Sequence, residues 1–486
     1  MSATITIRRK EYETLIETSQ LVEKLQHELA WLKRQIFGSK SERFIPNDDQ
    51  LSLDLGVDPT EQKTETQEIT YTRTTVKKTK GHGRGEMPTH LPFDDVIIEP
   101  EKAVEGCCKI GEEVSWEYEF KPGTLFVRRY IRPKYSLPDG RGVLIATLPD
   151  RPIDKGNFGP GIMATVTNDK YLYHMPLNRQ RQKFSREYNV DFAESTLCDL
   201  IAKSVFWMES VYSIQKSDIL QATYLQADET TIPVLIKNKK GKTHRGYYWV
   251  YFDPVRKIVI YEYQKGRGRA GPNAFLKIFS GILQVDGYTG YDELAQQDKI
   301  TRAACMAHVR RMFEKALEYD AVASRYAMKV IGTWFEVERE AKKHDADYDA
   351  RLKMRVHLKD QFADFKAWML KQATDRIPSD LIRKACEYGL GQWAGFDAYL
   401  TDGRVELSNN LVENAVRPIT LGRKNYLFKG SHEAAQRGAI IYSLIATAKM
   451  HGWNPREYIQ ILLEKLPCEK ANNINAYLPY CMKPRA

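Results

Sequence analysis

Three short stretches, far apart in the chain, each place one acidic residue at a position where such residues bind metals. Asp228 lies in a strand pattern, Asp286 ends an apolar strand pattern, and Glu413 lies near the start of a helix pattern. The separations are 58 residues (286 − 228) and 127 residues (413 − 286), so only a fold that gathers distant elements can bring the acids together. Hard divalent cations such as Mg²⁺ need converging carboxylates. The pattern therefore predicts a metal-dependent enzyme that acts on phosphodiesters.

Length and composition favour a multidomain globular protein. A chain of 486 residues is expected to form two to four domains. It contains no apolar run of about 18 residues or more, so no membrane span is expected. The N-terminus lacks the apolar core of a secretory signal, and seven scattered cysteines do not describe a disulfide framework. A reducing cytoplasm is the expected compartment.

The positive charge is clustered rather than uniform. The net charge is +10, and residues 121–134 contain five cations, among them Arg128 and Arg129, but no acid. Such clusters are typical of proteins that bind phosphate backbones. A solvated basic face is the alternative for any single cluster.

The first 150 residues divide into three predicted parts. Residues 1–44 contain Leu15, Val22, Leu29 and Ile36 at intervals of seven, which favours a dimerising coiled coil over an amphipathic helix packed on its own domain. Residues 45–95 are polar and predict a flexible linker. Residues 96–150 predict a small β-rich unit. Its Cys107-Cys108 is a single pair where a structural zinc site needs four ligands, so no zinc is expected.

Residues 151–220 predict a helical region. A basic segment at 177–184, which includes Arg179 and Arg181, is followed by a break near residue 189 and by a second helix pattern. This arrangement is typical of helix-turn-helix DNA readers. A purely structural helix pair is the alternative.

Residues 221–450 predict an α/β domain of the ribonuclease H type. Strand patterns at 224–236 and at 247–263, with a hairpin at Asp253-Pro254, are followed by alternating helix and strand. A helical insertion is expected at 316–405, where Trp393 either fills a core or stacks on an unpaired base. Next come a basic, aromatic loop at 422–430, a helix at 432–450 and a helical tail at 451–486.

Each acid also has an ordinary structural explanation. Asp228 and Glu229 are adjacent, so on a strand they face opposite sides, and periodicity cannot say which enters a site. Asp286 precedes a glycine, which is a common turn pair. Glu413 follows Asn410 at the spacing of a capping box.

Longer motifs resemble a known family. The string from Asn409 to Pro418 and the segment from Gly422 to Phe428 resemble those of bacterial insertion-sequence transposases of the sixty-six family, IS66. The strings Ala227-Asp228-Glu229-Thr230, Asp286-Gly287-Tyr288 and Ala307-His308-Val309-Arg310-Arg311 do so too, as does the segment from Leu32 to Glu42. The resemblance implies a DDE transposase whose triad is Asp228, Asp286 and Glu413, and it selects Asp228 over Glu229. Family members usually carry two cysteine pairs in the small β unit, which again argues against zinc here.

The resemblance implies that the triad holds two Mg²⁺ ions, with Mn²⁺ as a substitute, for cleavage and strand transfer of double-stranded element ends and target DNA. The expected partners are a homodimer or higher oligomer and small accessory proteins. A metal-dependent nuclease that does not join DNA, or a non-catalytic DNA-binding dimerisation factor, are the alternatives. The residues expected to contact DNA are His308, Arg311, Arg417, Arg423, Lys424, Arg179, Arg181, Arg128 and Arg129.

Overall fold

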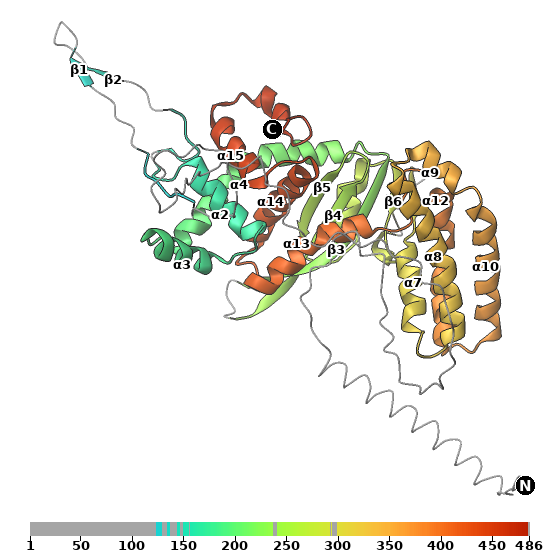
Figure 1. The fold of residues 1–486 in the computed structure, drawn as a ribbon. Coiled ribbons are helices and arrows are strands. Elements are labelled where there is room, and N and C mark those ends of the chain that lie inside the picture. The colour runs from blue at the N-terminus through green and yellow to red at the C-terminus, as the bar shows by residue number, and fades with distance from the viewer. Residues whose placement is uncertain are drawn as a thin grey trace, which may run out of the picture. The chain divides into compact units, whose positions relative to one another are not determined.

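The computed structural model covers most of the chain beyond residue 148 and short segments before it (Figure 1). It describes residues 123–128, 134–136, 143–145, 149–154, 156–236, 241–291, 293 and 299–484. The predicted coiled coil of residues 1–44, the linker of residues 45–95, Cys107-Cys108 and Arg129 lie outside the described residues. Within residues 96–150, two short strands, β1 (Lys134–Ser136) and β2 (Val143–Ile145), pair antiparallel.

A five-stranded mixed sheet lies at the centre of the longer described part. It comprises β3 (Tyr224–Leu235), β4 (Thr243–Asp253), β5 (Ile258–Gln264), β6 (Gly281–Gln284) and β7 (Ile300–Ala303). The spatial order is β5-β4-β3-β6-β7, antiparallel from β5 to β3 and parallel from β3 to β7. The predicted α/β class, the strand patterns and the hairpin at Asp253-Pro254 are confirmed.

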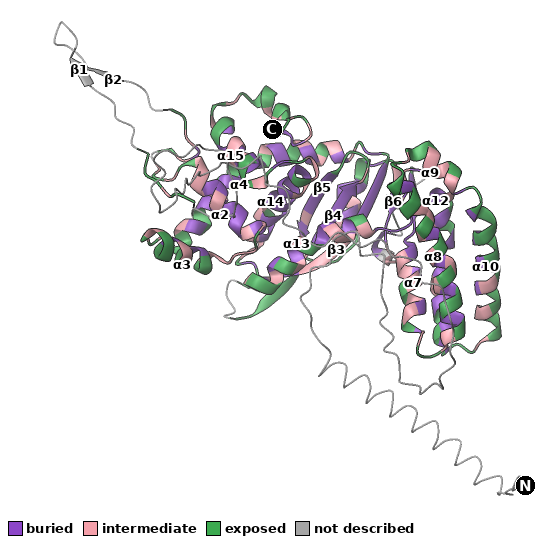
Figure 2. Cartoon of the chain, in the orientation of Figure 1, coloured by how far each residue is buried: buried purple, intermediate pink, exposed green. Residues whose placement is uncertain are grey.

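Helices from both ends of the chain cover the sheet. On one face, α13 (Asn410–Tyr426) lies across β3 and β4, and α14 (His432–Met450), which confirms the helix predicted at 432–450, packs on β5 (Figure 1). The short α5 (Ala270–Phe275) contributes to the other face, where Phe275 stacks on Tyr251 with ring centroids 4.0 Å apart. The strands between these layers are largely buried (Figure 2).

The edge of β5 is closed by side chains instead of a further strand. Ser443 and Thr447 of α14 accept hydrogen bonds from the amides of Tyr261 and Val259, at 2.8 and 3.0 Å. Tyr212 and Gln215, on α4 (Glu194–Ile219), donate to the carbonyls of the same two strand residues. An open edge invites pairing with other chains, so this arrangement satisfies the strand within the monomer.

The region before the sheet is helical, as predicted. It contains α2 (Pro160–Tyr171), α3 (Leu177–Tyr188) and α4, and α3 ends where Asn189 takes a left-handed conformation with φ 53°. The C-terminal α15 (Pro455–Lys465) packs against α2 and α4. Helices from before and after the sheet therefore share one hydrophobic core. Its buried residues on α15 are Tyr458, Ile459, Leu462 and Leu463.

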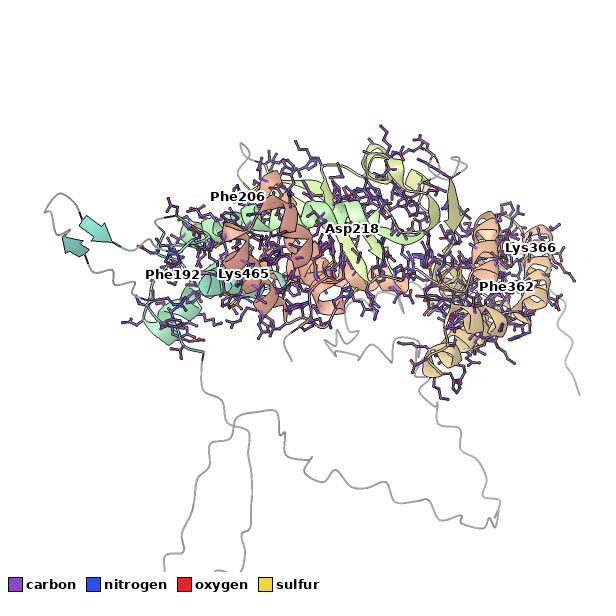
Figure 3. All side chains as sticks on the ribbon, turned by 90° about the horizontal axis from the view of Figure 1, so that it is seen from above. Phe192, Phe206, Asp218, Phe362, Lys366 and Lys465 are labelled. Carbon is purple, nitrogen blue, oxygen red and sulfur yellow. The ribbon has the colours of Figure 1, made fainter. Side chains whose placement is uncertain are left out.

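A second core lies in the helices between β7 and α13. They are α7 (Met306–Lys315), α8 (Ala321–Lys343), α9 (Tyr348–Met354), α10 (Leu358–Asp375), α11 (Leu381–Gly391) and α12 (Asp397–Thr401). Phe362, labelled on α10 in Figure 3, stacks on Trp334 with centroids 3.9 Å apart. Trp393 is 8% exposed and packs on Phe362 and Phe365, so it is a core residue rather than a stacking platform for bases.

The loop predicted at 422–430 is wrong for its first half. Residues Gly422 to Tyr426 continue α13, and only the last four residues leave the helix. Arg423 donates from Nη1 to the carbonyl and hydroxyl oxygens of Thr231 on β3, and this tertiary contact holds the helical turn against the sheet. The basic and aromatic composition of the segment suggested a loop. The contact between Arg423 and Thr231, which joins residues far apart in the chain, could not be predicted from the sequence.

A substitution at Gly281, the first residue of β6, tests whether the close packing of this strand, which leads to Asp286, is needed for stability. Its φ is 147°, and a Cβ there would lie 2.3 Å from the carbonyl oxygen of Thr223. We expect Gly281→Ala to destabilise the protein by at least about 2 kcal/mol, measured by urea unfolding. Gly332→Ala is the control, because a Cβ at this position in α8 meets no atom within 4 Å and should stabilise the helix by up to about 1 kcal/mol. Equal effects of the two substitutions would contradict this account.

Candidate active site

Two glutamines align the first two acids. Gln226 of β3 and Gln284 of β6 are register partners in the parallel pair, and Gln226 donates to the Gln284 side-chain oxygen at 2.9 Å. Asp228 and Asp286 each follow two residues later. Because side chains alternate along a strand, Asp228 lies on the face of β3 that carries Gln226. The matched spacing brings Asp228, within β3, to the same level of the sheet as Asp286, which lies just beyond the end of β6.

The same glutamines hold the element that carries the third acid. Gln226 accepts from the amide of Val412 at 3.1 Å and donates to the carbonyl of Ser408 at 3.1 Å. Gln284 donates to the carbonyl of Glu406 at 2.8 Å. The segment before α13 and the first turn of α13 are thereby bonded to the centre of the sheet, so the position of Glu413 is tied to that of the other two acids.

Asp228 is buried and electrostatically coupled to both other acids. Its pKa is raised from 3.8 to about 8, chiefly because burial disfavours the charged carboxylate. The charges of Glu229, Glu413 and Asp286 also raise this pKa, whereas a hydrogen bond of 2.8 Å from the amide of Glu229 lowers it. The three predicted acids therefore lie close enough in the fold for their charges to interact, and burial together with these charges disfavours the ionised form of Asp228.

Asp286 is held by its own turn. Its Oδ1 accepts from the amide of Tyr288 at 2.9 Å, and its backbone carbonyl accepts from Nη2 of Arg302 at 2.9 Å. An aspartate bonded to the amide two residues on is a common turn device, as the sequence suggested. The turn accounts for one oxygen of the carboxylate and fixes its direction.

Glu413 is not part of a capping box. The N-cap of α13 is Asn409, whose side chain makes no capping hydrogen bond. Glu413 Oε1 is buried and has no hydrogen-bond partner among the described residues. Its oxygens lie 3.9 Å from His308 Nδ1 and 3.6 Å from Arg311 Nη2. The capping-box interpretation is therefore wrong, and the carboxylate is oriented toward α7.

Glu229 faces the other side of the sheet. Its carboxylate accepts from Nε and Nη2 of Arg267, and its side chain is 5% exposed. Burial raises the pKa of Glu229, and the bonds from Arg267 lower it. The guanidinium of Arg267 lies 3.9 Å from the ring centroid of Tyr288. Periodicity alone could not exclude Glu229 from the candidate site. In the structure its carboxylate is paired with Arg267, which is 38 residues away in the sequence.

The predicted DNA contacts fall into two groups. His308 and Arg311 lie beside Glu413, and Arg417 and Lys424 are exposed on α13, whereas Arg423 is bonded to Thr231. The other predicted DNA contacts that the structure describes belong to segments that precede β3 in the chain. Of these, Arg179 and Arg128 are exposed and Arg181 pairs with Asp191 at 2.9 Å.

Sequence reasoning missed Cys305 and the two glutamines. Cys305 is buried just before α7, and burial raises the pKa of its thiol to about 12. One ligand atom each from Cys305, His308 and Glu413 lie within 4.8 Å of one another. Burial lowers the pKa of His308, although the charge of Glu413 raises it. A glutamine two residues before each aspartate was the available signal for Gln226 and Gln284.

Comparison with known proteins identifies the family. A family model described as "Transposase IS66 family" matches residues 155–437, which include all three acids. The chain belongs to the IS66 transposase family. Two further models match, "Transposase C of IS166 homeodomain" at residues 24–96 and "IS66 C-terminal element" at residues 443–480.

Relatives of this IS66-family chain extend over nearly its whole length. The uncharacterized protein y4jD of Sinorhizobium fredii is 30% identical, covering 96% of both chains. The uncharacterized protein y4hP of the same organism is 28% identical over 94% of this chain and 88% of its own. Among the described helices, none has the length and apolarity needed to cross a membrane.

The raised pKa of Asp228 predicts how stability of the metal-free IS66-family protein depends on pH. The folded-state pKa lies above the ordinary value of 3.8, so the stabilising effect of the bound proton is complete below about pH 4 and lost as the pH rises to about 8. We expect urea unfolding in EDTA to show a loss of up to about 1.4 kcal/mol per pH unit between about pH 6 and about pH 8 from this group. Asp228→Asn should flatten that dependence, and a parallel curve for the variant would contradict the assignment.

Proposed function

We propose that this chain is the DNA transposase of an insertion sequence, cleaving element ends and joining them to target DNA through Asp228, Asp286 and Glu413. The observation that carries the proposal is that the fold brings these acids close enough for their charges to interact, with the pKa of Asp228 raised chiefly by burial and further by the charges of Glu229, Glu413 and Asp286. Strand order supports a ribonuclease H type of core, since three antiparallel strands are extended by two parallel ones. Membership of a transposase family supports DNA as the substrate.

The residues fit hard divalent cations. The charges of the three carboxylates interact, the pKa of Asp228 is raised by burial and by the neighbouring acids, and Glu413 Oε1 is buried without a hydrogen-bond partner among the described residues. Oxygen ligands of this kind suit Mg²⁺ or Mn²⁺. When bound, such ions supply Lewis-acid activation of an oxygen nucleophile and stabilise the leaving oxygen. Asp228, Asp286 and Glu413 would hold them.

The protein's own groups orient the substrate around this cluster. Arg311 lies 3.6 Å from Glu413 and is half-exposed, so its remaining donors can reach a phosphate oxygen beside the carboxylate. Arg417 and Lys424 are exposed further along α13 and can neutralise phosphates of the same strand. Arg423 holds α13 on β3 and positions the acid indirectly.

The test of the reaction is joining of a labelled element-end DNA to a target plasmid with Mg²⁺. We expect Asp228→Asn, Asp286→Asn and Glu413→Gln each to lower the joining rate by at least about a thousandfold, because each removes a metal ligand. Glu229→Gln is the matched control, since its carboxylate is adjacent in sequence but bonded to Arg267 on the other face. It should keep activity within about tenfold of the wild type.

Other results would distinguish the alternatives. Cleaved ends without joined product would indicate a nuclease of the same fold. DNA binding without any chemistry, after accessory proteins encoded by the element are added, would indicate a non-catalytic factor. Loss of activity in Glu229→Gln equal to that in Asp228→Asn would overturn the assignment of the triad.

The salt dependence of DNA binding tests the face of α13. We expect Arg417→Ala and Lys424→Ala each to reduce the slope of log affinity against log salt by about one, because each removes about one phosphate contact. Lys366→Ala is the control, an exposed lysine on α10 that is labelled in Figure 3. Filter binding of a duplex at several salt concentrations measures the slope. An unchanged slope in both α13 variants would place the DNA elsewhere.

A further inference from the structure

The turn after α13 holds a leucine in a strained conformation. Leu427 has φ 62° and ψ −48°, and the amide of Phe428 donates to the carbonyl of Tyr426 at 2.7 Å. This is a three-residue γ-turn of the rarer, left-handed form, which a side chain with a Cβ seldom adopts. Backbone strain of this kind persists only where the surroundings enforce it, and it is concentrated at functional sites.

The strained turn displays two large apolar side chains. Leu427 is 63% exposed and Phe428 is 41% exposed. Neither side chain is needed to fill a core at this position. The strain therefore directs apolar surface outward at the end of a helix instead of burying it.

The chain is anchored on both sides of the turn. On one side, the amide of Leu427 donates to the carbonyl of Arg423 at 3.0 Å. On the other, Lys429 donates to Pro233 at 2.8 Å and accepts from Leu235 at 2.9 Å, which attaches the backbone to the end of β3. Two fixed attachments leave Leu427 and Phe428 little freedom to relax.

The side chain of Lys429 is buried beside the second anchor. It is 3% exposed, and its Nζ lies 4.5, 4.6 and 5.6 Å from the ring centroids of Tyr171, Tyr426 and Tyr442. These rings come from α2, α13 and α14, so the lysine joins the three helices below the turn. Buried in this way, Lys429 is a structural anchor and not a contact for DNA phosphates.

The turn follows directly on the stripe of α13 that carries the third acid. Glu413, Arg417, Thr420 and Lys424 follow one another at intervals of four, three and four residues, which places them on one face of the helix, and Leu427 is the C-cap residue three positions after Lys424. The stripe thus begins at a candidate catalytic carboxylate, continues through two exposed cations and ends at the exposed turn. From Glu413 to Leu427 the helix rises about 21 Å, which corresponds to about six nucleotide steps of DNA.

We propose that Leu427 and Phe428 form an apolar wedge that inserts between, or stacks on, bases of the DNA bound along α13. The proposal rests on the proposed function, in which DNA reaches Glu413. Apolar side chains at such positions separate base steps and bend the duplex, and aromatic rings stack on exposed bases without regard to sequence. The base step that is opened lies about six nucleotides from the reacting phosphate.

The alternative explanation for the exposed apolar side chains of Leu427 and Phe428 is that they bind a second protein. The cations at Arg417 and Lys424 favour a polyanion on this face, because they border the turn on the side of the carboxylate. The sequence-independent character of stacking also suits a transposase that must handle varied target DNA.

The experiment compares binding of the full chain to three duplexes of one sequence, each of about 30 base pairs, by fluorescence anisotropy. One is fully paired, one has a central two-base mismatch and one a central abasic site. A wedge must unstack a paired duplex but not an opened one, so the wild type should prefer the opened duplexes by about tenfold. Leu427→Gly and Phe428→Ala should each reduce this preference to about twofold or less.

Two controls separate loss of the wedge from loss of the fold. Leu370→Ala removes an exposed leucine of a different helix, α10, where it is 51% exposed, and should keep the preference. Leu427→Gly should unfold at or above the wild-type temperature, because glycine adopts a positive φ without strain. A lower unfolding temperature for Leu427→Gly would contradict the strain on which the proposal depends.

The outcomes distinguish this proposal from the proposed function. If the wild type binds none of the duplexes, the proposed function itself fails. If it binds all three equally, or if both wedge variants keep the preference, DNA binding stands and the wedge is overturned. A change of oligomeric state in Phe428→Ala on size-exclusion chromatography, with the preference intact, would assign the turn to a protein partner instead.

Discussion

The hydrogen bonds of Gln226 and Gln284 connect the parts of the chain that the candidate site requires. They join β3, β6 and the first turn of α13, and Gln284 also donates to the carbonyl of Ala304 beyond β7. An amide offers both a donor and an acceptor, so a glutamine pair can satisfy several buried backbone groups at once. It does so without charge. A charged pair in the same place would add its field to a group of carboxylates in which burial, together with the neighbouring charges, already raises the pKa of Asp228.

Because side chains alternate along β3, the adjacent acids Asp228 and Glu229 lie on opposite faces of the sheet, in different environments. Asp228 shares its face with α13 and experiences Glu413 and Asp286, whereas Glu229 lies on the opposite face against Arg267. The stacking of Arg267 on Tyr288 connects that opposite face to the turn of Asp286. The Arg267–Glu229 ion pair therefore lies on the opposite face from Asp228 and contacts the turn of Asp286 through Tyr288.

The sequence predicted the elements better than it predicted the contacts between them. Alternation and composition were sufficient for β3, β4, β5 and α14, since these signals are local. They were insufficient for the choice between Asp228 and Glu229, because the deciding partner, Arg267, is distant in sequence and meets β3 only in the fold. The loop predicted at 422–430 failed for the same reason, since Arg423 extends α13 through a bond to Thr231. Whether the gathered acids perform the chemistry stays a prediction.

The strain at Leu427 follows from this extension of α13. Because the helix continues to Tyr426 and Lys429 must pair with β3 at Pro233, only two residues remain to reverse the chain. A glycine at Leu427 would make the reversal without strain. The chain instead has a large apolar residue there, followed by another, with both exposed and the next residue buried among tyrosines. Stability alone would not favour that choice, so the display of apolar surface beside the basic stripe of α13 is better explained by what binds to it.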